Sequence, residues 1–250
     1  MKTNRLFMIL SLVVMLVVNI MANALPINGL TTGEISDRFP ILFVPEGYVF
    51  SIWGLIYLAL IAFVIYSVTS KGKGDERIDA IAWWFVASNL FNTAWILFWH
   101  NLQFALTLVA IFGLLISLVA IYLMLGIGKV KRPIVEKLLV DVPFGIYLGW
   151  ATVAVVANVS QVLYFNGWRG EPLTEPAWAV IMVLVASVLG LLMIFTRKEV
   201  AYPLVLTWAF IGIWVKQSGT PAVAVTALIG AILLAVLAVG RRPISRLGGR

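Results

Sequence analysis

Residues 44–60 read VPEGYVFSIWGLIYLAL, and this stretch decides the fold class. It begins as a loop, with Pro45 and Gly47, and continues as an apolar run that reaches Thr69 without a charged residue. A helix of about 20 apolar residues crosses the roughly 30 Å hydrocarbon core of a bilayer. The run over Tyr48–Thr69 therefore predicts a membrane-spanning helix.

Apolar segments of this kind recur along the chain. The eight segments are Leu6–Leu25, Tyr48–Thr69, Ala80–Trp99, Leu102–Gly126, Val142–Tyr164, Pro176–Thr196, Tyr202–Val215 and Pro221–Gly240. Hydrophobic residues make up 62% of the chain and charged residues only 12%. Because a spanning backbone must satisfy its own hydrogen bonds in lipid, the pattern predicts an all-α, polytopic integral membrane bundle of about eight transmembrane helices.

The basic residues predict the orientation. With the N-terminus inside, all but three of the 18 lysines and arginines fall on the cytoplasmic side, the exceptions being Arg38, Arg169 and Lys216. Cytoplasmic loops of membrane proteins carry this excess, so the net charge of +7 needs no nucleic acid partner. We expect a bacterial cytoplasmic membrane with both termini cytoplasmic.

The first segment allows a second interpretation. Lys2 and Arg5, the apolar run and then Ala22, Asn23 and Ala24 resemble a secretory signal with its cleavage site. The run is long for a signal, which favours a retained helix.

Conventional catalytic chemistry is sparse in this chain. There is no cysteine, which excludes disulfides and thiolate sites. No charged residue falls well inside a segment, which argues against an ion-coupled transporter. The single histidine, His100, is expected to be a polar cap rather than a haem ligand. We expect no metal and no resident cofactor, and the residues favour a protein that is not an enzyme.

Amide and aromatic side chains nevertheless follow helical faces. The three faces are Phe50, Trp53 and Tyr57; Ser88, Asn92, Trp95 and Trp99; and Tyr147, Trp150, Ala154, Asn158 and Gln161. A polar amide facing lipid is costly, so these faces should point into the bundle. They can serve either to tie helices together or to line a ligand pocket. Gly145 and Gly149 predict close helix contact, either within the chain or at a dimer interface.

Three of these motifs resemble those of the tryptophan-rich sensory protein (TspO/MBR) family, which includes the translocator protein or peripheral benzodiazepine receptor of animals. The matching residues are Pro45, Gly47, Tyr48, Phe50, Trp53 and Tyr57, then Asn92, Trp95, Phe98 and Trp99, and then Tyr147, Leu148, Trp150 and Asn158. Tyr48 replaces the usual tryptophan of the loop, and the spacing from Phe50 to Trp53 is one residue short. The resemblance covers residues 1–168, a five-helix core, and leaves 169–250 as three additional helices with a short basic tail.

The resemblance implies a bundle, usually dimeric, whose first loop closes a pocket for a porphyrin, haem or another planar hydrophobic molecule. The implied ligand-binding residues are Tyr48, Phe50, Trp53, Tyr57, Asn92, Trp95, Trp99, Tyr147, Trp150 and Asn158. Arg38 is the only nearby candidate for a propionate. The implied function is that of a sensory or receptor-like protein, and the alternatives are a passive carrier of hydrophobic molecules and a light-dependent porphyrin-degrading enzyme.

Overall fold

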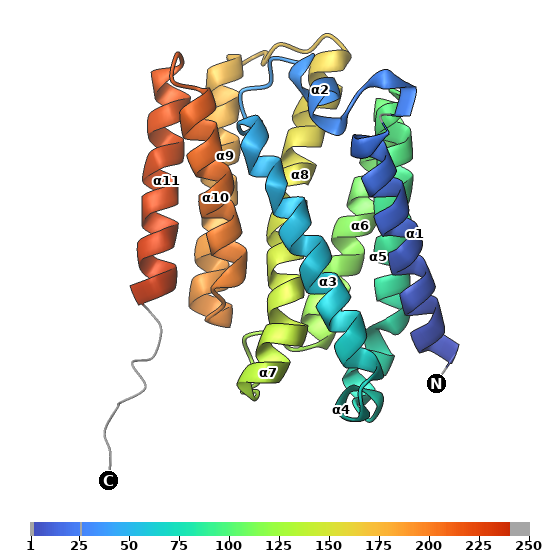
Figure 1. The fold of residues 1–250 in the computed structure, drawn as a ribbon. Coiled ribbons are helices and arrows are strands. Elements are labelled where there is room, and N and C mark those ends of the chain that lie inside the picture. Colours follow the sequence, from blue (N-terminus) through green and yellow to red (C-terminus); the bar gives the residue numbers. More distant parts are fainter. Residues whose placement is uncertain (1–2, 26, 241–250) are drawn as a thin grey trace.

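The computed structural model describes residues 3–25 and 27–240 and confirms the all-α class. Each predicted apolar segment forms a helix, and the helices stand side by side in one bundle (Figure 1). They are α1 (Thr3–Ala24), α3 (Ile52–Val68), α5 (Glu76–His100), α6 (Phe104–Met124), α8 (Val142–Phe165), α9 (Glu175–Leu192), α10 (Ala201–Lys216) and α11 (Pro221–Gly240). Seven of these are long and apolar enough to cross a membrane, and α10 is a shorter apolar helix.

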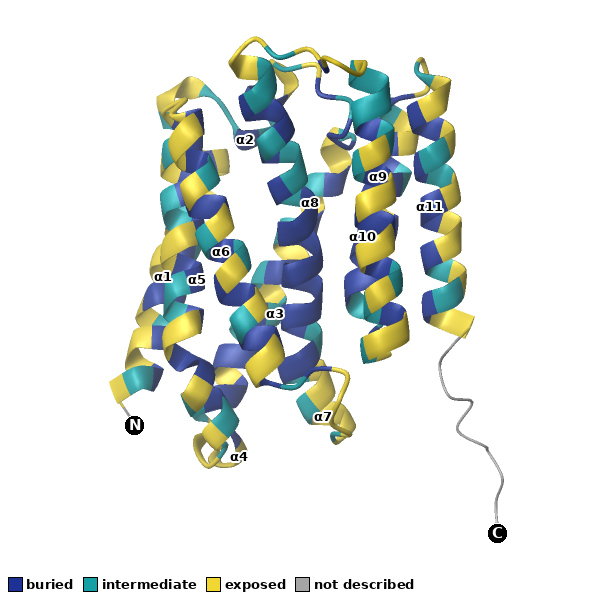
Figure 2. Cartoon of the chain, turned by 180° about the vertical axis from the view of Figure 1, so that it is seen from behind, coloured by how far each residue is buried: buried dark blue, intermediate teal, exposed yellow. Residues whose placement is uncertain are grey.

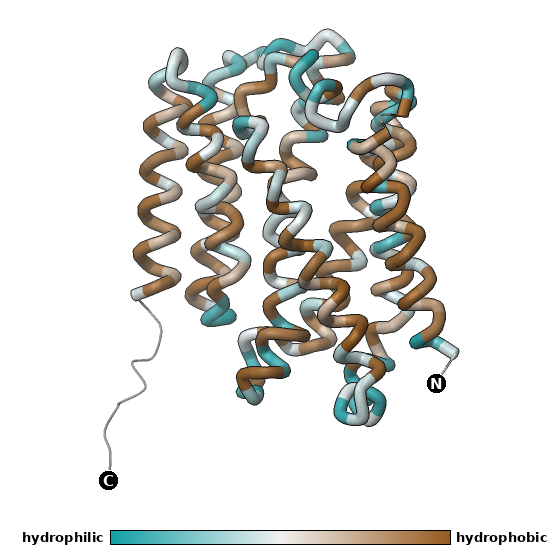
Figure 3. Tube along the Cα trace, in the orientation of Figure 1, coloured by the Kyte–Doolittle hydropathy of each residue, from teal (hydrophilic) through white to brown (hydrophobic). Residues whose placement is uncertain are grey.

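Short elements join the long helices. They are the 3-10 helices η1 (Ile27–Gly29) and η2 (Gly47–Ser51), the α-helices α2 (Thr32–Asp37), α4 (Ser70–Lys73) and α7 (Ile134–Glu136), and the π-helical turns η3 (Lys137–Asp141) and η4 (Met193–Arg197). Hydrophobic residues fill the long helices and hydrophilic ones gather at the two ends of the bundle (Figure 3). This distribution is that of an integral membrane protein.

The two ends differ in charge. We call the end that carries α2 and residues 27–51 the loop end, and the opposite end, with the start of α1, α4 and α7, the basic end (Figure 1). Most described basic residues lie at the basic end: Arg5, Lys71, Lys73, Arg77, Lys129, Lys131, Arg132, Lys137, Arg197 and Lys198. Lys2, Arg241, Arg242, Arg246 and Arg250 lie outside the described residues.

Ion pairs join the elements of the basic end. Arg5 of α1 is buried and lies 2.9 Å from the Asp79 carboxylate of α5. Arg77 pairs with Asp75 at 2.6 Å and with Glu136 of α7 at 2.8 Å. Asp75 also caps α5, since it accepts from the Arg77 backbone N–H, and the Arg77 side chain holds the pKa of that carboxyl below its ordinary value. These pairs connect α1 to α5 and α5 to α7 at this end.

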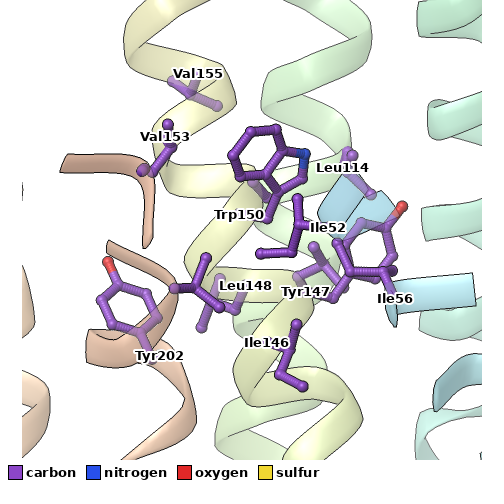
Figure 4. Packing of buried hydrophobic residues seen from close by; sticks show 14 of the residues in the cluster. Ile52, Ile56, Leu114, Ile146, Tyr147, Leu148, Trp150, Val153, Val155 and Tyr202 are labelled. Carbon is purple, nitrogen blue, oxygen red and sulfur yellow. The ribbon is translucent and has the colours of Figure 1, made fainter. Parts of the chain in front are cut away.

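Helix α8 is the central helix of the bundle. Figure 2 shows it as the most continuously buried element. Tyr147 and Trp150 face the side of α3, whereas Leu148 and Val153 face Tyr202 of α10 (Figure 4). One face of α8 therefore belongs to the five-helix core and the other to the C-terminal helices.

The two glycines of α8 explain this close approach to α10. A Cβ added to Gly149 would lie 3.0 Å from the Tyr202 carbonyl oxygen, and one added to Gly145 would lie 2.9 Å from Glu199 Oε1. Of the two interpretations of this glycine pair, the structure shows contact within the chain. The predicted boundary near residue 168 falls in the connection between α8 and α9, and the division into two domains stays a prediction.

Candidate functional site

An aromatic cluster forms where η2 and α3 meet α8. Trp53 lies edge-on to Trp150 and to Tyr147, with ring centroids 6.1 Å away in both cases. Phe50 contacts Trp150 at 5.7 Å, and Tyr57 stacks on Trp53 at 5.7 Å. The predicted faces of these two helices are thus brought together ring against ring.

A relay of side-chain hydrogen bonds continues from this cluster across four helices. The Tyr57 hydroxyl donates to Asn19 Oδ1 at 2.8 Å, and Asn19 Nδ2 donates to Asn92 Oδ1 at 2.7 Å. Asn92 Nδ2 then donates to the Tyr147 hydroxyl at 2.9 Å. Asn19, the contribution of α1, was not among the predicted site residues. Its signal in the sequence is that it is an amide deep within the apolar run Leu6–Leu25, whereas Asn23 lies near the end of that run.

A second group of predicted residues meets nearer the loop end. The Trp95 indole N–H donates to Asn158 Oδ1 at 3.0 Å, and Trp95 stacks on Trp99 at 5.1 Å. Asn158 Nδ2 donates to the Thr107 hydroxyl at 2.9 Å, which links α8 to α6. The Trp99 indole N–H donates to the Thr32 carbonyl oxygen at 3.2 Å. The first loop, which is the connection over residues 27–51, is therefore bonded to this group.

The first loop closes the loop end through aromatic contacts as well. The Phe39 ring lies 5.3 Å from Phe104 and 6.4 Å from Tyr164, edge-on to both. His100 is buried, with Nε2 3.1 Å from the Thr32 hydroxyl and Nδ1 3.2 Å from the Ile27 carbonyl oxygen. Both imidazole nitrogens contact the first loop, which agrees with the predicted polar cap.

The predicted residues differ in accessibility. Asn92, Trp95, Trp99, Tyr147, Trp150 and Asn158 are buried, whereas Phe50, Trp53 and Tyr57 are half-buried. Tyr48 lies apart from the others, because it is exposed and contacts Trp208 of α10 at 5.5 Å. Arg38 is exposed at the end of α2. The α3 side is therefore the accessible wall of the cluster.

Two buried donors on the same face of α8 have no acceptor among the described residues. They are Nε1 of Trp150 and Nε2 of Gln161. Both side chains are nearly inaccessible to solvent, at 2% and 3% exposure. Buried donors are almost always paired in native proteins, so each marks a place where a ligand atom could accept a hydrogen bond.

Groups suited to metal binding or general acid–base catalysis do not gather at this site. Among residues 3–25 and 27–240, no three histidine, cysteine, aspartate or glutamate side chains could share a metal ion. What the cluster offers chemically is aromatic surface and amide hydrogen bonding.

A large hollow lies elsewhere, between the five-helix core and α10. Its volume is about 1090 Å³, and its walls come from α3, α7, η3, the start of α8, η4 and α10. Apart from one aromatic ring, that of Trp208, the lining is mostly aliphatic. Glu199 lies at its edge, where burial raises the pKa of the carboxyl. The sequence pattern did not predict this hollow.

Together, the fold and the site define a polytopic membrane bundle that holds an aromatic and amide cluster beneath a closed first loop. The family of TSPO-like proteins matches the chain over residues 5–240. The chain therefore belongs to the TSPO-like family, which confirms the resemblance to TspO/MBR proteins. The match includes α9, α10 and α11 as well as the core that carries the motifs. No curated protein and no solved structure matches the chain.

Proposed function

We propose that this protein is a membrane sensory or receptor-like protein that binds a planar hydrophobic ligand, such as a porphyrin or haem, at the aromatic cluster of α3 and α8. One observation carries the proposal. The Trp150 indole N–H is buried without an acceptor among the described residues, and it lies in the ring cluster with Phe50 and Trp53. A bound macrocycle would supply both an aromatic face and an acceptor.

The energetics suit a flat ligand. Each stacked or edge-on aromatic contact contributes on the order of 1 kcal/mol beyond simple burial. The half-buried rings of Phe50, Trp53 and Tyr57 offer such contacts on the accessible wall. The buried amides behind them hold these rings in place through the relay from Tyr57 to Tyr147. A rigid aromatic wall with few polar groups is typical of sites for apolar ligands.

The orientation belongs to the same proposal. The basic end would face the cytoplasm of a bacterial cell, since basic residues concentrate in cytoplasmic loops. The loop end, with Arg38 as the candidate partner of a propionate, would face the opposite side. A homodimer is the family's usual assembly, and we propose it for this chain on that ground.

The test is a titration of the purified, detergent-solubilised protein with protoporphyrin IX, followed by tryptophan fluorescence. Trp150→Phe keeps an aromatic ring but removes the N–H, and Trp150→Ala removes both. The loss of one hydrogen bond should weaken binding about threefold to tenfold, and Trp150→Ala should weaken it further. Trp84→Phe is the matched control, because Trp84 is exposed on α5.

Saturable quenching that is weakened only by the Trp150 variants would support the proposal. Equal binding by Trp150→Ala and Trp84→Phe, with circular dichroism showing both variants folded, would refute it. Flux into liposomes and loss of porphyrin absorbance under light would then separate a receptor from a carrier and from an enzyme.

A further inference from the structure

The hollow beside α10 results from the path of α3. At the loop end the residues that lead into α3 contact α10. The Glu46 N–H donates to the Gly212 carbonyl oxygen at 3.2 Å, and the Trp208 indole N–H donates to the Val49 carbonyl oxygen of η2 at 3.0 Å. Toward the basic end α3 slants away from α10 and reaches α4 beside α5 (Figure 1). The helices diverge, and the space between them is the hollow.

The body of the hollow is aliphatic and open to its surroundings. Leu55, Leu138 and Leu204 line it and are exposed. Its walls run along α10 from Ala201 to Trp208, about 10 Å of helix. Small-molecule sites are typically about 300–1,000 Å³, so a volume of about 1090 Å³ is ample for a ligand. An exposed aliphatic channel within a membrane protein suits a flexible alkyl chain better than a flat ring.

The end of the hollow at the basic end carries positive charge. Lys137 and Lys198 both line it, both are exposed, and neither forms a salt bridge within the described part of the chain. The nearby Glu199 carboxylate is hydrogen-bonded at the start of α10, where it accepts from the backbone N–H groups of Ala201 and Tyr202 at 2.9 and 2.7 Å. Neither lysine is thus held by a salt bridge in the described residues, and both can contact an anion at this end of the apolar channel.

We propose that this hollow is a binding site for an anionic phospholipid of the surrounding membrane, separate from the aromatic cluster. One acyl chain lies along α10 between Leu55 and Leu204, and the phosphate of the head group contacts Lys137 and Lys198. Basic pockets between transmembrane helices bind anionic head groups in this way. The lipid would fill the gap between the five-helix core and the C-terminal helices, and so join the two parts.

Native mass spectrometry of the purified full-length protein tests this assignment. The protein is stripped of lipid and then titrated with phosphatidylglycerol or, in parallel, with phosphatidylcholine. We expect one phosphatidylglycerol to bind per chain in preference to phosphatidylcholine. The double variant Lys137→Gln/Lys198→Gln should weaken phosphatidylglycerol binding about thirtyfold, the effect expected from two lysines near an anionic head group.

Two controls keep the experiment decisive. Lys71→Gln/Lys73→Gln removes the same charge from α4 at the same end, outside the hollow, and should leave binding unchanged. Leu204→Trp places a bulky ring in the hollow from an exposed position and should abolish binding without disturbing the buried core.

Three results would overturn the assignment. They are equal binding of the two lipids, equal weakening by the two lysine pairs, and full binding by Leu204→Trp. Displacement of the bound lipid by protoporphyrin IX would instead assign the hollow to the planar ligand. The lipid site and the porphyrin site can fail separately, because Trp150 and the two lysines are tested by different ligands.

Discussion

Asn92→Leu should be among the most destabilising single substitutions in the bundle, and the structure gives a sharp way to test it. Asn92 is 1% exposed and forms two interhelical hydrogen bonds, accepting from Asn19 and donating to Tyr147. Leucine has a similarly branched, though bulkier, side chain and makes neither bond. Asn19 stays satisfied because Nδ2 also donates to the Met15 carbonyl oxygen at 2.8 Å. The Tyr147 hydroxyl, which is fully buried, loses the donor that the structure gives it.

The expected magnitude follows from these contacts. Interhelical side-chain hydrogen bonds in membranes contribute about 0.6 kcal/mol on average, so the two lost bonds cost about 1.2 kcal/mol. A buried polar group left without a partner costs a further 1–3 kcal/mol or so. Asn92→Leu should therefore lower the free energy of unfolding by about 2–4 kcal/mol.

A double variant tests whether Asn92 and Tyr147 interact. In Asn92→Leu/Tyr147→Phe both bonds are lost but no hydroxyl is left unpaired, so the cost should fall to about 1–2 kcal/mol. The second substitution should thus rescue the first. The assay is unfolding by SDS from mild-detergent micelles, followed by circular dichroism. If the effects of the two substitutions add to within about 0.5 kcal/mol, the two side chains do not interact and the relay is wrong.

Two further predictions concern the packing of α10 and the cap of α5. Gly212→Ala should lower the free energy of unfolding by about 1–3 kcal/mol, because its Cβ would lie 2.2 Å from Val49 Cγ2. Gly54→Ala is the control, because its Cβ meets nothing within 4 Å. It should be neutral or stabilising in the same SDS titration. The pKa of Asp75 is lowered by Arg77, so its stabilising effect is present above the unfolded pKa, near 3.9 or so, and is lost as the pH falls through the folded value. Asp75→Asn should flatten this acid limb in thermal unfolding measured between about pH 3 and 6, and an unchanged acid limb would contradict the pairing.

Much of the fold could be predicted because few backbone structures are stable in lipid. Backbone hydrogen bonds force helices, and the apolar runs set their number and approximate limits. The faces of α5 and α8 could be predicted for a similar reason. A buried amide needs a partner, and helical spacing decides which side chains share its face. Asn92 and Asn158 do lie inside the bundle, with Tyr147 and Trp95 as partners. Their role in ligand binding stays a prediction.

Other features depend on which helices pack against each other. The spacing of residues along a single helix does not predict this. Asn19 has no amide or aromatic partner at helical spacing that marks its face, so its place in the relay follows only from the packing of α1 against α5 and α3. Tyr48 could not be placed from its motif, because its contact with Trp208 comes from a helix outside that motif. For the same reason, the sequence did not show which helix packs against Gly145 and Gly149. In the structure this helix is α10.

The hollow beside α10 also depends on how the helices pack against each other. Its existence depends on the angle between α3 and α10. The residues just before α3 are joined to α10 at the loop end, where Glu46 contacts Gly212 and Val49 contacts Trp208. The same first loop is tied to Trp99 and His100 of α5. The first loop therefore contacts both the group around Trp99 and the C-terminal half of α10, so a ligand that moved this loop, under the proposed function, would also change the hollow.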